Sequence, residues 1–206
     1  MVRLLTSVGI LLCTLGPVFA QHRVTVRIVD DSSGEVLPAR LYLRAVDGET
    51  PYFFESTSAE GTAVRYEKQN WINQASVEYH TTISPHPVMA VVPAGKYELV
   101  VERGKTYFPH QQTIEVAGDI DVSVSLRSWA DMAKRGWYSG DLHIHRSIDE
   151  LRNVVLAEDL NVVFPLTQWV TLADTPPSSG NKNAAGDLPR ELVQVDAQHV
   201  IWPLST

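Results

Sequence analysis

From residue 22 to about residue 126, the chain is a series of short segments in which apolar and polar residues alternate, separated by turns rich in Asp, Ser, Gly and Pro. The first of these segments places Val24, Val26 and Ile28 at every second position. Successive side chains of a β-strand point to opposite faces, so this alternation indicates strands with one buried face. Several such strands with little helical periodicity predict an antiparallel β-sandwich over residues 21–127.

The first 20 residues have the organisation of a secretory signal peptide. Arg3 supplies a positive charge, residues 4–15 are an apolar run, and Ala20 ends a cleavage sequence of small or modest side chains. The apolar run is shorter than the roughly 20 residues of a membrane-spanning helix. We therefore expect export to the periplasm or the extracellular medium, without a membrane span after cleavage. An uncleaved N-terminal anchor is the alternative.

Charge and cysteine content narrow the classes of function further. The formal net charge is −7 and no dense run of Lys or Arg occurs, so we expect no nucleic-acid partner. The only cysteine, Cys13, lies in the signal sequence, and Leu12 before it is larger than the small residue of a lipoprotein site. A metal site in the mature chain must therefore use His, Asp or Glu, which favours zinc, manganese or iron.

Residues 69–87 interrupt the strand pattern and are predicted to form a long irregular excursion between two strands. This stretch carries Trp71, Tyr79, His80 and His86. Long loops often carry function, so these rings could grip a sugar. The alternative is that they close the open end of the sandwich.

After the sandwich the pattern changes. Residues 128–140 are predicted to be a connector, followed by a strand over 141–145, a helix over 148–159 and a strand over 162–166. This β-α-β order is the unit of a parallel sheet or barrel. Residues 193–204 are predicted to be strand-like again.

The sequence Gly-Asp-Leu-His-Ile-His carries the clearest chemical signal. On a strand, Asp141, His143 and His145 share one face, while Leu142 and Ile144 share the other. Two adjacent imidazoles can provide the first two ligands of a divalent cation, with a carboxylate as ligand or ring-orienting partner. A polar strand face in contact with water is the alternative. We expect both faces to be covered, which favours metal binding.

Residues 136–166, which begin GWYSGDLHIH, resemble the opening of the PHP superfamily of metal-dependent hydrolases, and most closely its exported CehA/McbA-like branch. The sandwich is similar to the carboxypeptidase-regulatory or transthyretin-like type, on residues 34–40 (GEVLPAR) and 93–97 (PAGKY). These resemblances imply an α+β chain of two parts: an antiparallel Ig/transthyretin-like β-sandwich, then the first βα units of a distorted (β/α) barrel over residues 141–206.

The PHP resemblance also implies the chemistry. Such a barrel holds two or three metal ions that activate water against a phosphate ester or a related bond. By that resemblance His143 and His145 are metal ligands, and Asp141 supports or bridges the metal as a catalytic residue.

Three further observations bear on this assignment. The second motif of the family is Thr-Asp-His, whereas residues 167–169 read Thr-Gln-Trp. The stretch from Trp137 to Thr206 is much shorter than the roughly 200 residues or more that a (β/α) barrel needs, which predicts an incomplete and inactive catalytic domain. His199, near a predicted strand, is our candidate for a third metal ligand. An ordinary surface or loop histidine is the alternative there.

Two classes of function are therefore weighed. The first is an exported metal-dependent hydrolase of a small-molecule or ester substrate, present as an incomplete catalytic domain. The second is a non-catalytic exported β-sandwich that binds a carbohydrate or a protein partner, with a degenerate PHP-like remnant. The sequence around Trp71 and the Thr-Gln-Trp departure favour the second. A purely structural exported domain is a third reading.

Overall fold

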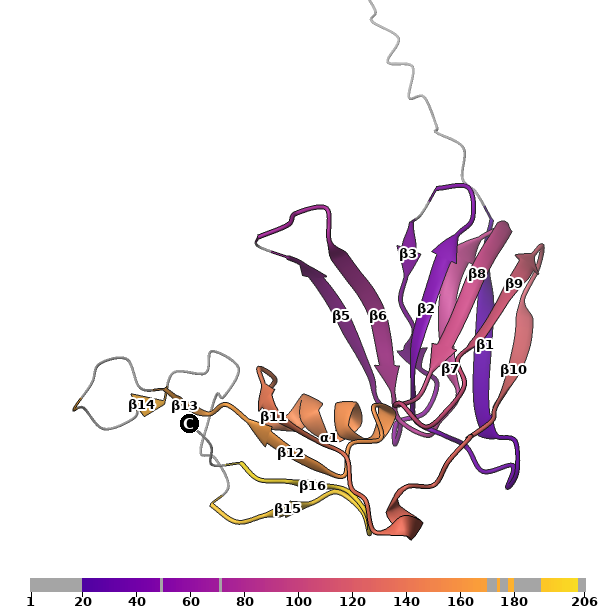
Figure 1. Cartoon of the computed structure of the whole chain (residues 1–206). Coiled ribbons are helices and arrows are strands. Elements are labelled where there is room, and N and C mark those ends of the chain that lie inside the picture. The colour runs from indigo at the N-terminus through magenta and orange to yellow at the C-terminus, as the bar shows by residue number, and fades with distance from the viewer. Residues whose placement is uncertain are drawn as a thin grey trace, which may run out of the picture.

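The computed structural model describes residues 20–48, 50–70, 72–169, 174, 178–179 and 190–203. A β-sandwich is followed by a smaller part that contains the α-helix (Figure 1). The predicted signal peptide, apart from Ala20, and Trp71 lie outside the described residues. No helix among the described residues is long and apolar enough to cross a membrane.

Ten strands in two sheets form the sandwich. One sheet has the order β10-β1-β7-β4, and the other has the order β5-β6-β2-β8-β9 with β3 paired to β2. The strands are β1 (Gln21–Asp30), β2 (Ala39–Ala45), β3 (Pro51–Tyr52), β4 (Glu55–Ser56), β5 (Ala63–Gln69), β6 (Val77–Ile83), β7 (Val88–Pro93), β8 (Gly95–Glu102), β9 (His110–Val116) and β10 (Ile120–Leu126).

The predicted sandwich is confirmed, with one change in strand direction. Val24, Val26 and Ile28 are buried in its core together with Leu41 and Leu99. The pairs within its two sheets are antiparallel except one: β1 and β10, the first and last strands, run parallel. The alternating apolar residues therefore fill the space between the two sheets, as the pattern predicts.

The predicted irregular excursion over residues 69–87 is wrong for its central part, because residues 77–83 form the regular strand β6. β5 and β6 form a regular antiparallel hairpin that projects beside the rest of the sandwich (Figure 1). The His80 ring is buried and stacks on Tyr66, with the ring centroids 4.7 Å apart, and Tyr79 packs edge-on against Phe53. The sequence pattern misses β6 because three of its buried residues, His80, Thr81 and Thr82, are polar, so it lacks the apolar alternation of a core strand.

The smaller part is built around a second, short sheet. Its order is β11-β12-β16-β15, in which β11, β12 and β16 are parallel and β15 is antiparallel to β16. Its elements are the 3-10 helix η1 (Ala133–Arg135), β11 (Gly140–Ile144), α1 (Ile148–Ala157), β12 (Val162–Pro165), β13 (Gln168–Trp169), β14 (Ser178–Ser179), β15 (Val193–Gln194) and β16 (Val200–Ile201). The predicted β-α-β unit is therefore present as β11-α1-β12.

The prediction that this unit begins a (β/α) barrel is wrong. The described residues contain one α-helix, and the next described element after β12 is β13, a two-residue strand that pairs with β14. A (β/α) barrel has eight tilted parallel strands, each followed by a helix of the outer layer. Here the sheet stays open, and the described part of the chain is almost entirely β-structure.

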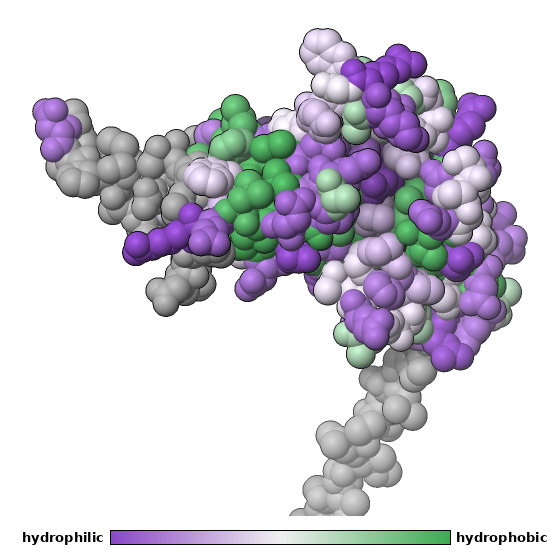
Figure 2. All heavy atoms as spheres, turned by 90° about the horizontal axis from the view of Figure 1, so that it is seen from below, coloured by the Kyte–Doolittle hydropathy of each residue, from purple (hydrophilic) through white to green (hydrophobic). Residues whose placement is uncertain are grey.

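α1 covers one face of this open sheet. It begins at the N-cap Ser147, and Leu151 and Val155 pack against Ile144, Val163 and Ile201. Figure 2 shows apolar side chains gathered on the underside of the molecule. Leu142 of β11 is 67% exposed, so the sheet is not covered on both faces.

Candidate ligand groove and histidine pair

His143 and His145 lie at the carboxyl end of β11, where its pairing with β12 is irregular. The register shifts between Asp141 and Ile144, and the buried Ile144 side chain anchors this end of the strand against α1. Irregular pairing of this kind changes where neighbouring side chains point. The two imidazoles converge here: their Nε2 atoms are 3.1 Å apart.

The expectation that this strand is covered on both faces is wrong. β11 is the edge strand of its sheet, and Asp141, His143 and His145 are all exposed. Burial therefore does not argue for metal binding here. The argument rests on the convergence of the two ring nitrogens.

Asp141 lies beside the pair and has a local role in the backbone. Its Oδ1 accepts a hydrogen bond of 2.9 Å from the backbone N–H of His143. This bond helps to hold the distorted end of β11 in place. The carboxylate also lines the same groove as the two histidines.

The histidine pair opens onto a groove of about 930 Å³ between the β5–β6 hairpin and the β11–α1 segment. Five cationic and five carboxylate side chains line this groove. They are Arg40, Arg65, Lys68, Lys105 and Arg146, and Glu67, Glu78, Asp141, Glu150 and Glu158. With neutral histidines, the formal charges of the lining cancel.

Ion pairs and ring contacts hold much of this lining in place. Arg40 pairs with Glu78 of the hairpin and with Glu158 just after α1, so it joins the sandwich to the smaller part. Arg146 pairs with Glu150 at 3.4 Å and lies over the Tyr66 ring, 4.4 Å from its centroid. The walls of the groove are therefore largely preformed.

His80 also lines the groove, as a neutral ring. Burial, with the positive charges of Arg40 and Arg146 nearby, lowers the pKa of His80 to about 3. Its ring stacks on Tyr66 and supports the hairpin side of the groove.

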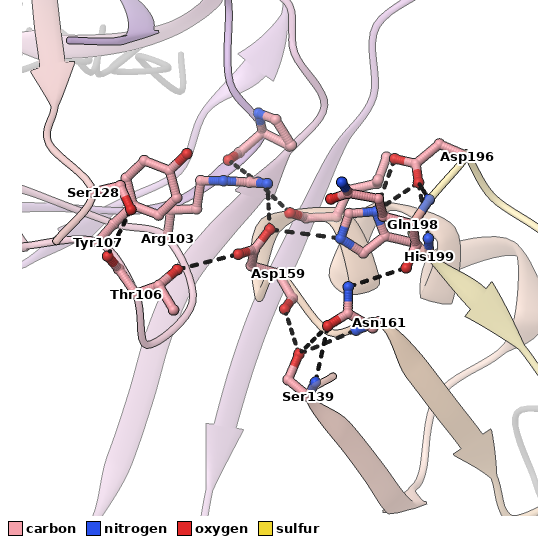
Figure 3. A network of polar contacts seen from close by, with 12 residues as sticks. Arg103, Thr106, Tyr107, Ser128, Ser139, Asp159, Asn161, Asp196, Gln198 and His199 are labelled. Atoms are coloured by element: carbon pink, nitrogen blue, oxygen red, sulfur yellow. Dashed lines mark hydrogen bonds and ion pairs between the residues drawn. The ribbon is translucent and has the colours of Figure 1, made fainter. Parts of the chain in front are cut away.

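His199, our candidate for a third ligand, belongs to a different network (Figure 3). The residue is 4% exposed, and its Nδ1 lies 2.7 Å from Oδ1 of Asp196. Its Nε2 lies 3.6 Å from Oδ1 of Asp159, which Arg103 contacts at 2.6 Å. The carboxylates of Asp159 and Asp196 raise the pKa of His199 although burial opposes this.

The structure therefore brings together two of the three predicted ligands. His143 and His145 converge with Asp141 beside them, whereas His199 does not line their groove. Within the part of the chain that the structure describes, no group of three His, Cys, Asp or Glu side chains could hold a metal ion. In the Thr-Gln-Trp stretch, Thr167 is buried and donates to the carbonyl of Pro203.

Sequence reasoning missed the half of the groove that the sandwich supplies. Arg40, Arg65 and Lys105 come from β2, β5 and the β8–β9 loop, and no sequence motif links these three places. Arg146 and Glu150 are different, because they come directly after the histidines and share a helical i, i+4 spacing.

Comparisons with known proteins give little support for any assignment. No protein-family model matches the chain, and no curated protein does. Among solved structures, the chain is similar to the pilus 2b backbone protein of group B streptococcus, at 15% identity and a TM-score of 0.35, covering 54% of this chain and 43% of that one. It is also similar to a minor pilin of Streptococcus agalactiae, at 13% identity and a TM-score of 0.33, covering 55% and 47%.

The chain thus spans less than half the length of these pilins. Similarity at these TM-scores does not establish a shared fold or a shared function.

Proposed function

We propose that the protein is an exported, non-catalytic β-sandwich module that binds an anionic ligand in the groove, through a divalent cation held by His143 and His145. The observation that carries this proposal is the 3.1 Å separation of the two Nε2 atoms at the edge of the groove. Two nitrogens that each lie 2.0–2.1 Å from one tetrahedral zinc ion are about 3.3 Å apart. The pair therefore fits two positions of such a coordination sphere.

The charge of the groove determines which ligand the cation would attract. The five cationic and five carboxylate side chains of the lining balance. A divalent cation at the histidine pair gives the groove a net charge of about +2, and two protein ligands leave coordination positions for other oxygen atoms. A carboxylate or phosphate group supplies both the negative charge and the oxygens.

Export is the part of this proposal that rests on sequence. The charged start, the apolar run and the Ala20 cleavage sequence are those of a signal peptide.

Hydrolysis by a PHP-like centre is the second candidate function. The sequence resemblance and the parallel β11-α1-β12 unit, with both histidines at the end of its first strand, favour it. A catalytic zinc site uses three protein ligands and an activated water. The described residues supply two converging ligands and do not fit a complete centre, so we derive no hydrolytic step for this chain.

Isothermal titration of the purified mature chain with Zn²⁺ tests the proposal. We expect one zinc site per chain, lost in His143→Ala and in His145→Ala and kept in His22→Ala, which removes a histidine outside the groove. Phenylphosphonate should then bind only when zinc is present. Zinc binding that is equal in all three variants would overturn the proposal.

An assay with bis(p-nitrophenyl) phosphate separates the two functions. We expect no difference in turnover between the zinc-loaded protein and its His143→Ala variant. Turnover that depends on His143 would replace the binding function by the hydrolytic one.

A further inference from the structure

We propose that a second cavity, separate from the histidine pair, binds a neutral saccharide. This cavity has a volume of about 600 Å³. It lies where the turn after β1 and the β8–β9 loop of the sandwich meet the connector (residues 128–139) and the segment directly after α1. It goes beyond the groove function and does not depend on a cation.

Two aromatic side chains of the connector line the cavity without being buried. Trp137 is 70% exposed and Tyr138 is 67% exposed, and Tyr107 of the β8–β9 loop lines the cavity as well. Neighbouring exposed aromatic rings at a cavity are typical of binding sites, where Trp and Tyr are enriched. A pyranose has a flat face of C–H groups that can pack on a ring of this kind, and Trp and Tyr add a polar handle at the edge.

Both signs of charge line the cavity, which argues against a highly charged ligand. Three cationic and five carboxylate side chains line it, and four of them form two ion pairs, Arg103–Asp159 and Lys134–Asp131. A polyanion would meet the carboxylates, and a polycation would meet the cations. Hydroxyl groups that both donate and accept hydrogen bonds match such a lining.

The acidic turn after β1 provides one set of acceptors. Hydrogen bonds from Ser32 first, then from Ser33 and Tyr107, lower the pKa of Asp30 to about 2, so its carboxylate is ionised at any physiological pH. The hydroxyls of Ser32 and Ser33 lie around it, at 2.5 and 3.3 Å from Oδ1. Both hydroxyl protons are already donated to Asp30, so this turn offers its remaining oxygen lone pairs as acceptors for sugar hydroxyls.

The remaining wall is a hydrogen-bonded network (Figure 3). Arg103 is 8% exposed and donates to the carbonyls of Pro38 and Leu156 as well as to Asp159. Ser139 donates to the Asp159 carbonyl and contacts the Asn161 side chain at 3.1 Å. A wall already fixed by such bonds loses little conformational freedom on binding, which favours affinity.

NMR titration of the ¹⁵N-labelled mature chain tests the inference. The probes are cellotriose, maltotriose, xylotriose and triacetylchitotriose, each at millimolar concentration, with choline as the cationic alternative and inorganic phosphate as the anionic one. We expect at least one trisaccharide to shift the Trp137 indole N–H and the amides of Ser33 and Ser139. Trp137→Ala and Tyr138→Ala should each weaken its binding about tenfold.

Phe108→Ala is the matched control, because Phe108 is an exposed aromatic residue of the β8–β9 loop that does not line the cavity. His143→Ala should leave saccharide binding unchanged, which separates this site from the groove. Failure of all four trisaccharides to shift these resonances would overturn the inference. So would binding of choline or phosphate alone, or a loss in Phe108→Ala equal to that in Trp137→Ala.

Discussion

His80 and His199 are both buried, yet their surroundings shift their pKa values in opposite directions. Burial, next to Arg40 and Arg146, keeps His80 neutral, although the half-exposed carboxylate of Glu78 lies 3.2 Å from its Nδ1. His199 lies between two carboxylates and favours its protonated form. The pKa of a buried histidine can thus be lowered or raised, depending on the charges that it faces. The pH range in which the histidine stabilises the folded protein changes accordingly.

These two groups predict a maximum of stability near pH 6.5. Below about pH 6.5 the unfolded chain protonates His80 and the folded one does not, so stability falls as the pH falls toward 3. The contribution of His199 is complete below about pH 6.5 and is lost as the pH rises through its raised pKa. Each effect amounts to at most about 1.4 kcal/mol per pH unit. Urea unfolding across this range measures both slopes.

Two variants assign the slopes. His80→Phe keeps a ring against Tyr66 and should remove the part of the acid-side fall that begins near pH 6.5, above the range in which aspartates with lowered pKa values, such as Asp159, titrate. His199→Gln keeps a polar side chain beside Asp196 and should remove the fall on the alkaline side. Retention of the alkaline fall in His199→Gln would show that another group causes it.

At the scale of elements, the β8–β9 loop meets the end of α1 at Gly104. Gly104 has a positive φ of 47°, and its N–H donates to the Ala157 carbonyl at 3.2 Å. A Cβ added there would lie 2.6 Å from the Cβ of Asp159 and 2.7 Å from the Glu158 carbonyl oxygen. Only glycine allows the loop and the helix end to approach this closely.

Gly104→Ala should therefore lower the free energy of unfolding by about 2–4 kcal/mol, since it adds both a strained backbone and a steric overlap. Urea unfolding measures the change. Two other glycines separate the causes. Gly34 has a positive φ of 74° but open space around it, so Gly34→Ala should cost about 1–2 kcal/mol. Gly118 has open space and no positive φ, so Gly118→Ala should have little effect. Equal losses at all three positions would contradict this account.

The elements that could be predicted from sequence are those with a strong local pattern. β1 alternates, and α1 has its N-cap Ser147 with Glu150 three residues later, a capping-box spacing. The β5–β6 hairpin lacks an apolar alternation, so its register is set by pairing and ring stacking that only the fold reveals. The histidine pair is predictable from its i, i+2 spacing on a strand. The cationic side chains that the sandwich adds to the groove are not, because they depend on how the β5–β6 hairpin packs against the β11–α1 segment.

At the scale of the whole molecule, the sandwich and the smaller part differ in the size of their hydrophobic cores. The sandwich buries a large apolar cluster between its sheets, whereas the smaller part buries Ile144, Leu151, Val155, Val163 and Ile201. α1 also relies on the sandwich, because Asn153, which is buried, donates to the Thr82 carbonyl of β6 at 2.6 Å. The prediction of a barrel was wrong at this scale, because one β-α-β unit occurs in many kinds of sheet and does not determine whether the sheet closes into a barrel.

We expect residues 21–127 to fold alone and residues 128–206 not to. So small a core rarely stabilises a segment of this length without staples. The ¹⁵N–¹H spectra of the two separately expressed segments check this. Residues 21–127 should give well-dispersed resonances and unfold cooperatively in urea. The resonances of residues 128–206 should lie close to random-coil shifts. A dispersed spectrum for residues 128–206 would show that the smaller part is an independent domain.

The parallel pairing of the first and last sandwich strands has a mechanical consequence. Because β1 and β10 run side by side from Val24–Ile120 to Asp30–Leu126, a pull on the two ends of the sandwich acts along the strands. The hydrogen bonds between them are then loaded together in shear rather than broken one after another, as they would be in an antiparallel pair pulled from one end. The sandwich is therefore built to transmit tension from its first strand to its last. The groove lies outside this strand pair, whereas the cavity includes Asp30 at the end of the pair.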